Sequence, residues 1–297
     1  MIAAVLQQIT RIPLRPRRWT CHPRLGQHPS RLRGSGLAFD QIKEYQAGDA
    51  IRRINWAATA RRGDGMLLMN TYFEEKEVVV MLLVDLSASM DFGSSRVTKK
   101  TLAAEICASL VYSALLAQDR VGFLGFAGRA VAFLPPRQAW TYLRTIPETL
   151  IRYQSAHTLA DFPAAVTRFL QYCHRPTLVF LLSDFLYEDL DAVRHALARL
   201  QQRHEPIVIV LSDPREASFP PATARLVVCD LETGRQVTYR FSRHKPPPVA
   251  TRAAQHRETV EHMLRTLRIP FIIATAYSDY SQDLRQLLLM PRRRGSG

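Results

Sequence analysis

Apolar stretches alternate along most of the chain with stretches in which apolar residues recur at helical spacing. The first apolar run, residues 78–85, precedes a segment in which Leu102, Ile106 and Leu110 would share one helical face. Further strands are predicted at 120–126, 130–134, 177–182, 206–211 and 271–274, and further helices at 140–150, 159–172, 189–202, 252–267 and 280–289. Apolar strands alternating with amphipathic helices are typical of a parallel sheet covered on both faces. We therefore predict a doubly wound α/β fold with a mostly parallel sheet.

The pattern divides the chain into three parts. Residues 1–33 are rich in proline and arginine and predict a basic, irregular arm. Residues 34–76 carry glycine turn signals between short stretches of mixed polarity, which predicts a small, loop-rich and partly β segment. Residues 77–297 form the predicted α/β domain, with a hairpin signal at Glu232-Thr233-Gly234.

Composition narrows the class of protein. With 297 residues, 47% of them hydrophobic, the chain can bury a core of ordinary density. The run Val78–Val84 is far too short to span a bilayer, and the first ten residues lack the basic start of a secretory signal. We therefore expect no transmembrane segment and a cytoplasmic location. The four cysteines form no CxxC pair, which argues against zinc ligation and a disulfide framework.

The formal net charge of +14 is concentrated at the two ends of the chain. Residues 1–33 contain seven arginines and no acid, and residues 292–294 add three more arginines. Such an arm can bind nucleic acid, an anionic surface or an acidic protein. Trp19 is its one aromatic residue, so no stacking platform for single strands is visible. Nucleic-acid binding through this arm stays an alternative function.

Polar residues follow the predicted strands at one edge of the sheet. Asp85, Ser87 and Ser89 follow the first strand, and Ser183-Asp184 follow a later one. Thr158 lies between them in the chain, at the start of a predicted helix. In open α/β sheets, ligands bind beyond the carboxyl ends of the strands. Carboxylate and hydroxyl oxygens at this density suit Mg²⁺ or Mn²⁺.

Each of these residues also has a purely structural interpretation. Asp85 could cap the turn that follows its strand, and Asp184 could cap the next helix. Thr158 could equally be a helix N-cap. Against this, an aspartate with two serines at alternate positions favours metal binding. The predicted ligands are two carboxylates and three neutral hydroxyls. If one carboxylate binds only through water, the charge of the ion stays largely uncompensated. The ion would then bind an anionic oxygen from a partner.

These motifs resemble two known patterns. Residues 85–90, DLSASM, together with Thr158 and Asp184, resemble the metal-ion-dependent adhesion site of von Willebrand factor A domains. Upstream, the chain is similar to the signature of the bacterial domain-of-unknown-function 58 family: Gly34, Gly36, Phe39, Glu44-Tyr45, Gly48-Asp49, Arg53-Ile54-Asn55-Trp56 and Ala60-Arg61. The resemblance implies an adaptor or partner of MoxR-type AAA+ ATPases that binds a partner carboxylate through Mg²⁺.

Enzymatic interpretations find little support in the sequence. A phosphotransferase of the haloacid dehalogenase type needs a second aspartate two residues after the first, where this chain has Ser87. No GxSxG, GxxxxGKS or HExxH motif occurs. We therefore expect a protein that is not an enzyme. A bound divalent ion could still polarise a phosphoryl group, so a metal-dependent phosphoester hydrolase is the lesser alternative.

Overall fold

A computed structural model describes residues 2–14, 37–49, 51–74, 78–94, 97–128, 130–154, 160–217, 225–229, 236–240 and 248–289. The chain divides into two compact units. The large unit comprises Met1–Arg18 and Val78–Gly297, and the small unit comprises Trp19–Glu77.

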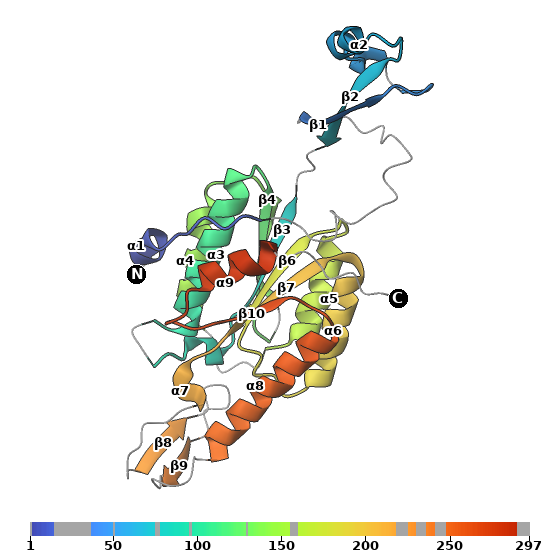
Figure 1. The fold of residues 1–297 in the computed structure, drawn as a ribbon. Helices are drawn as coiled ribbons and strands as arrows, with labels where there is room; N and C mark the ends of the chain where they lie inside the picture. Colours follow the sequence, from blue (N-terminus) through green and yellow to red (C-terminus); the bar gives the residue numbers. More distant parts are fainter. Residues whose placement is uncertain are drawn as a thin grey trace. The chain divides into compact units, whose positions relative to one another are not determined.

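A six-stranded sheet forms the centre of the large unit (Figure 1). Its strands are β3 (Val79–Asp85), β4 (Arg120–Phe126), β5 (Ala130–Arg137), β6 (Leu178–Ser183), β7 (Glu205–Leu211) and β10 (Phe271–Ala274). They lie in the order β10-β7-β6-β3-β4-β5. All neighbours pair in parallel except β4 and β5, which form an antiparallel hairpin at one edge. The predicted doubly wound, mostly parallel sheet is therefore confirmed.

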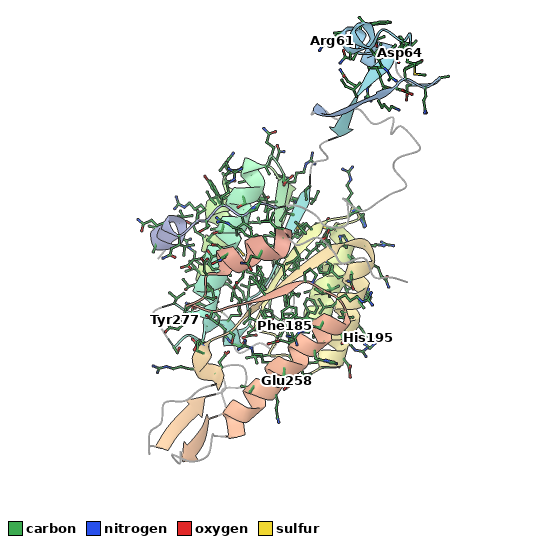
Figure 2. The ribbon with its side chains drawn as sticks, in the orientation of Figure 1. Arg61, Asp64, Phe185, His195, Glu258 and Tyr277 are labelled. Atoms are coloured by element: carbon green, nitrogen blue, oxygen red, sulfur yellow. The ribbon has the colours of Figure 1, made fainter. Side chains whose placement is uncertain are left out.

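Helices cover both faces of this sheet (Figure 1). One face carries α3 (Lys99–Leu116), α4 (Tyr142–Arg152) and α9 (Tyr280–Leu289), and the other carries α5 (Phe162–Tyr172), α6 (Leu190–Arg203) and α8 (Pro248–Thr266). Short elements complete the unit: the 3-10 turn η3 (Ala88–Asp91), the single turn α7 (Pro214–Ala217) and the antiparallel pair β8 (Arg225–Cys229) and β9 (Gln236–Arg240). Side chains, Phe185 among them, fill the space between sheet and helices (Figure 2).

The strand β3 lies in the interior of the sheet, between β4 and β6. Every side chain from Val80 to Asp85 is buried. Met81 and Leu83 pack in one core with residues of α5, α6 and α8. Because side chains alternate along a strand, Leu82 faces the opposite layer. Burial on both faces explains why this strand is a continuous apolar run.

Part of the segment predicted to be an irregular basic arm is packed against the large unit. Residues Ile2–Gln7 form α1, and Val5 and Ile12 are buried. The backbone amide of Ile12 donates to Ser113 Oγ at 2.7 Å, and that of Thr10 donates to Ser109 Oγ at 3.1 Å. Two hydroxyls of α3 thus bind this segment, and its apolar side chains drive its burial. Residues 15–33 lie outside the described residues.

The small unit is built on an antiparallel pair, β1 (Leu37–Glu44) and β2 (Leu68–Glu74), with a 3-10 turn η2 (Ile51–Arg53) and the helix α2 (Trp56–Arg62) between them. Asn55 caps α2 by accepting from the amide of Ala58 at 2.9 Å. Gly63 ends the helix in the left-handed conformation, with φ of 70°, which glycine adopts without strain. The predicted partly β character of this segment is confirmed.

The surface of the small unit carries ion pairs, and few of its described side chains are buried. Arg62 forms ion pairs with Glu44 at 2.9 Å and Asp64 at 2.6 Å. Among the small-unit side chains that the structure describes, only Ile54 and Met69 are buried. Trp56 of the family signature is 64% exposed.

No helix within the described parts of the chain is both long and apolar enough to cross a membrane.

Candidate metal-binding site

The candidate site lies where the chain reverses its direction across the sheet. From β3 the chain proceeds to β4 and β5 on one side, and it then crosses to β6 on the other side of β3. The carboxyl ends of β3 and β6 are therefore neighbours at a topological switch point, the usual place for a ligand in such folds. Val84 pairs with Leu182 in the register of these strands, so the polar residues that follow each strand emerge side by side.

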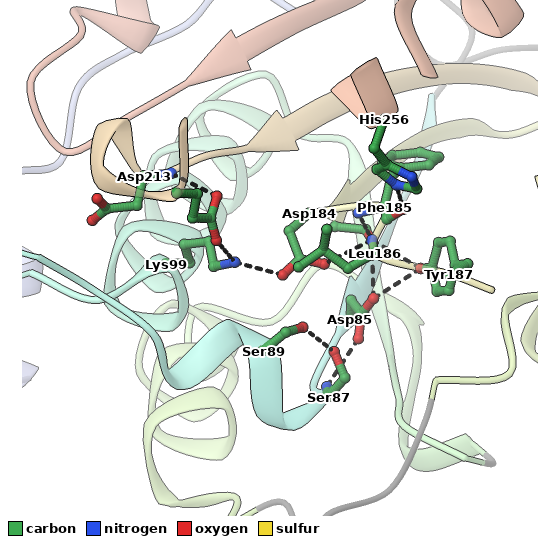
Figure 3. Close-up of polar contacts among 12 residues, drawn as sticks. Asp85, Ser87, Ser89, Lys99, Asp184, Phe185, Leu186, Tyr187, Asp213 and His256 are labelled. Atoms are coloured by element: carbon green, nitrogen blue, oxygen red, sulfur yellow. Dashed lines mark hydrogen bonds and ion pairs between the residues drawn. The ribbon is translucent and has the colours of Figure 1, made fainter. Parts of the chain in front are cut away.

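Three of the predicted ligands come together in the loop after β3 (Figure 3). Asp85 Oδ1 accepts from the backbone amide of Ser87 at 2.9 Å. The hydroxyls of Ser87 and Ser89 lie 3.0 Å apart and share a hydrogen bond. All three side chains are buried, and Asp85 is only 1% exposed. The amide of the buried Leu86, which donates to Phe126 at the end of β4, fixes the loop to the sheet.

The second oxygen of Asp85 is held by residues that follow β6. Asp85 Oδ2 accepts from Ser183 Oγ at 2.9 Å and from Tyr187 Oη at 2.8 Å. Sequence reasoning did not foresee either contact. Ser183 carries a signal, because it ends a buried strand, whereas nothing in the sequence marks Tyr187.

A tight backbone turn after Asp184 brings Tyr187 back to the site. Phe185 has φ of 59°, a left-handed conformation that is unusual for a bulky residue. Its amide donates to Ser183 Oγ, and its carbonyl oxygen accepts from the amide of Tyr187 at 2.8 Å. Burial and the nearby Asp85 raise the pKa of Tyr187 well above its usual value. The phenol therefore stays protonated and donates to Asp85.

Electrostatics at Asp85 favour the approach of a cation. Burial and the nearby carboxylate of Asp184 raise the pKa of Asp85 to about 6, against the opposing effect of the hydrogen bonds from Ser87 and Tyr187. A buried carboxylate whose charged form is this unfavourable is stabilised by an opposite charge placed beside it.

Asp184 lies at the site, but a lysine binds it. Its Oδ2 is 2.6 Å from Lys99 Nζ, and the same ammonium lies 2.5 Å from Glu216 Oε1. Burial opposes the charge on Lys99, yet Asp184 and Glu216 outweigh that effect and raise its pKa. The alternative that Asp184 caps the following helix is wrong, because Asp189 is the N-cap of α6 and accepts from Ala192.

Sequence reasoning also missed Lys99 and Glu216. The signal that was available is the first turn of α3, which holds Lys99 and Lys100 and no acid. Cations are unfavourable at the N-terminus of a helix, so lysines there require partners.

Thr158 lies outside the described residues, so its predicted role as a ligand stays a prediction. Its alternative role as the N-cap of the next helix is wrong, because Asp161 caps α5 by accepting from the amide of Ala164 at 2.9 Å. The amide of Asp161 donates to Ala127, directly after β4. The chain therefore returns to the carboxyl edge of the sheet just before α5.

The side chains at this edge fit a hard divalent ion. The oxygens of Asp85, Ser87, Ser89 and Asp184 are carboxylates and hydroxyls, the donor types that Mg²⁺ and Mn²⁺ accept. Within the described residues, no group of three or more His, Cys, Asp or Glu side chains could hold a metal. The serine hydroxyls must therefore contribute if an ion binds here.

Together, fold and site define a doubly wound α/β protein with a buried Asp-x-Ser-x-Ser loop at the switch point of its sheet. The chain belongs to the family described as protein of unknown function DUF58, whose model matches residues 41–263. Uncharacterized proteins of Mycobacterium tuberculosis and Mycobacterium bovis are 27% identical to it over 273 residues, which cover 91% of this chain and 84% of theirs.

The chain is also similar in structure to solved proteins. The conserved hypothetical protein BatB from Bacteroides thetaiotaomicron matches with a TM-score of 0.48 and 16% identity, over 71% of this chain and 97% of that chain. The SpRpn10 VWA domain matches with a TM-score of 0.42 and 10% identity, over 70% and 94% of the two chains. Similarity at this level does not bear on function.

Proposed function

We propose that this protein is a non-enzymatic, metal-dependent module for protein interaction. Asp85, Ser87 and Ser89 would hold Mg²⁺ or Mn²⁺, with Thr158 and, through water, Asp184 completing the site. The bound ion would supply an open coordination position for a carboxylate of a partner protein. The observation that carries the proposal is the convergence of Asp85, Ser87 and Ser89, all buried, at the switch point of the sheet.

The residues around the site support binding more than chemistry. Asp85 accepts hydrogen bonds from Ser87, Ser183 and Tyr187, so its oxygens are oriented rather than free to abstract a proton. The two serine hydroxyls bond to each other. Among the described residues at the site, no serine lies in a hydrogen bond with a histidine, the pairing that activates a nucleophile.

The partner that the family resemblance implies is a MoxR-type AAA+ ATPase. A partner carboxylate would complete the coordination and neutralise an ion that Asp85 alone compensates poorly. Binding should therefore depend on the metal, and a chelator should release the partner.

Titration calorimetry of the metal-free protein with Mg²⁺ and Mn²⁺ tests the metal site. We expect binding to wild type and none to Asp85→Asn, a variant of the same shape without the charge. Asp91→Asn is the matched control, since Asp91 lies on the same loop but pairs with Lys100 outside the cluster. Failure of well-folded wild type to bind either ion would overturn the metal site.

A binding assay with a MoxR-type ATPase, with Mg²⁺ or with chelator, tests the partner. Affinity that survives both chelation and Asp85→Asn would exclude coordination of a partner carboxylate. Metal-dependent turnover of p-nitrophenyl phosphate that Asp85→Asn abolishes would show that the protein is an enzyme after all.

A further inference from the structure

A buried lysine, Lys99, lies beside Asp184 at the candidate site (Figure 3). Lys99 is 3% exposed, and its ammonium lies between Asp184 Oδ2 at 2.6 Å and Glu216 Oε1 at 2.5 Å. One of the two carboxylates expected to serve the metal is thus already paired with a cation that belongs to the chain.

Lys99 needs these two carboxylates to stabilise its positive charge, because of its position in the helix. Lys99 is the first residue of α3, after the N-cap Thr98, where the helix dipole disfavours positive charge. Burial disfavours the charge further. Asp184 and Glu216 must compensate both effects, since the backbone near the helix start presents amide donors rather than acceptors.

Glu216 is held in position independently of Lys99. Its Oε2 accepts from the backbone amide of Asp213 at 3.2 Å. Asp213 is buried and accepts from the amides of Ser94 at 2.7 Å and Arg215 at 2.8 Å. The turn after β7 therefore presents a second carboxylate to Lys99 whether or not Asp184 is available.

An ammonium and a divalent cation on the same carboxylate would repel each other strongly in this buried setting. We propose that Lys99 is an internal cation that competes with the divalent metal for Asp184, and that Glu216 is the carboxylate that retains the ammonium when the metal binds. This inference rests on the proposed metal-binding function. Entry of the metal then shifts Lys99 toward the turn after β7, which couples occupancy of the site to that surface turn.

Calorimetric titration of Mg²⁺ and Mn²⁺ into Lys99→Met tests the competition. Methionine keeps the length of the side chain without its charge, so metal affinity should rise, by on the order of ten- to a hundredfold. Lys100→Met is the matched control. It removes the same charge from the next residue, which is also buried but pairs with Asp91 and with the carbonyl oxygen of Tyr153.

Lys99→Met leaves Asp184 without its partner and can lower the stability of the metal-free fold. Glu216→Gln therefore provides a second arm. With Glu216 neutralised, the ammonium depends on Asp184 alone, and metal affinity should fall several-fold. In the Lys99→Met background, the same Glu216→Gln change should have no effect, because Glu216 acts on the metal only through Lys99.

The outcomes separate this inference from the proposed function. If wild type binds the metal and Lys99→Met binds it with the same affinity, the competition is overturned but the proposed metal site is not. Equal gains in Lys99→Met and Lys100→Met would also overturn it, since a general charge effect would then suffice. A gain in metal affinity in Lys99→Met, with no gain in Lys100→Met, supports the competition. No binding in wild type or in any variant would overturn both ideas.

Discussion

The two units of this chain differ in the burial of their interacting polar residues. In the large unit, Asp85, Ser87 and Asp184 are buried at the end of interior strands, and each has defined hydrogen-bond or ion-pair partners. In the small unit, which carries much of the family signature, the ion pairs of Arg62 are largely exposed. Buried polar groups are costly unless fully partnered, whereas exposed ion pairs contribute little.

This contrast indicates different roles for the two motifs. The loop after β3 keeps the carboxyl of Asp85 buried and its pKa raised, which agrees with the binding site proposed above. Asn55 of the signature caps α2, and Arg62, which follows the signature residue Arg61, pairs with Glu44 at the surface of the same unit. With only Ile54 and Met69 buried among its described side chains, we expect the small unit to be the less stable of the two.

The largest expected effect is on the core beneath the site. Leu83 is fully buried on β3, so Leu83→Ala should lower the free energy of unfolding of the large unit by about 2–5 kcal/mol. Trp140 lies in the large unit and Trp56 in the small one. Urea unfolding of variants that lack Trp19 and retain only one of these two tryptophans should show a shift for Trp140 alone. Equal shifts of both signals would mean that the units unfold together.

A somewhat smaller effect is expected from pH on the metal-free protein. The pKa of Asp85 is raised to about 6, against about 3.9 in an unfolded chain. Between about pH 4 and 6 the folded protein keeps a proton that the unfolded chain has lost, so stability falls as pH rises through that window, by up to roughly 3 kcal/mol.

The difference between wild type and Asp85→Asn at each pH isolates this carboxyl from other acids. Urea unfolding at several pH values should show that difference growing up to about pH 6 and then levelling off. Saturating Mg²⁺ should reverse the sign of this difference, because the ion binds the charged form of Asp85 and stabilises the folded wild type but not Asp85→Asn. A difference that is constant with pH would contradict the raised pKa.

The sequence predicts the sheet and half of the site for the same reason. Strand length, burial and the spacing of Asp85, Ser87 and Ser89 are local properties, so a pattern within five residues is enough to define the loop. The parallel neighbours of β3 also follow from alternation of strands and helices, which brings Asp184 to the same edge.

The other half of the site depends on contacts that no local pattern encodes. Lys99 contacts Asp184, which lies 85 positions later in the chain, and Glu216, which lies 117 positions later. Tyr187 reaches Asp85 only because Phe185 adopts a left-handed backbone conformation, which a bulky residue does not signal. The docking of residues 2–14 on α3 likewise rests on serine hydroxyls about a hundred positions away.

Within the small unit, the larger effect should come from the helix cap. Asn55 accepts from Ala58 and donates to Asn70 Oδ1 at 2.9 Å, which joins α2 to β2. Asn55→Ala should lower the stability of the small unit by about 1 kcal/mol. Metal affinity in the large unit should stay unchanged. Calorimetry and the Trp56 unfolding signal check both statements, and an altered affinity would show that the signature segment acts on the site.

The smallest effect is expected at the surface ion pairs. Arg62→Ala removes the pairs with Glu44 and Asp64, whereas the neighbouring Arg61→Ala is a matched control, because Arg61 forms no ion pair with any residue that the structure describes. Arg62→Ala should lower the melting temperature of the small unit by a few degrees at most, and high salt should remove the difference because it screens exposed charges. A large, salt-insensitive loss would mean that Arg62 is buried in the folded protein. The contrast between an exposed signature segment and a buried candidate site would then fail.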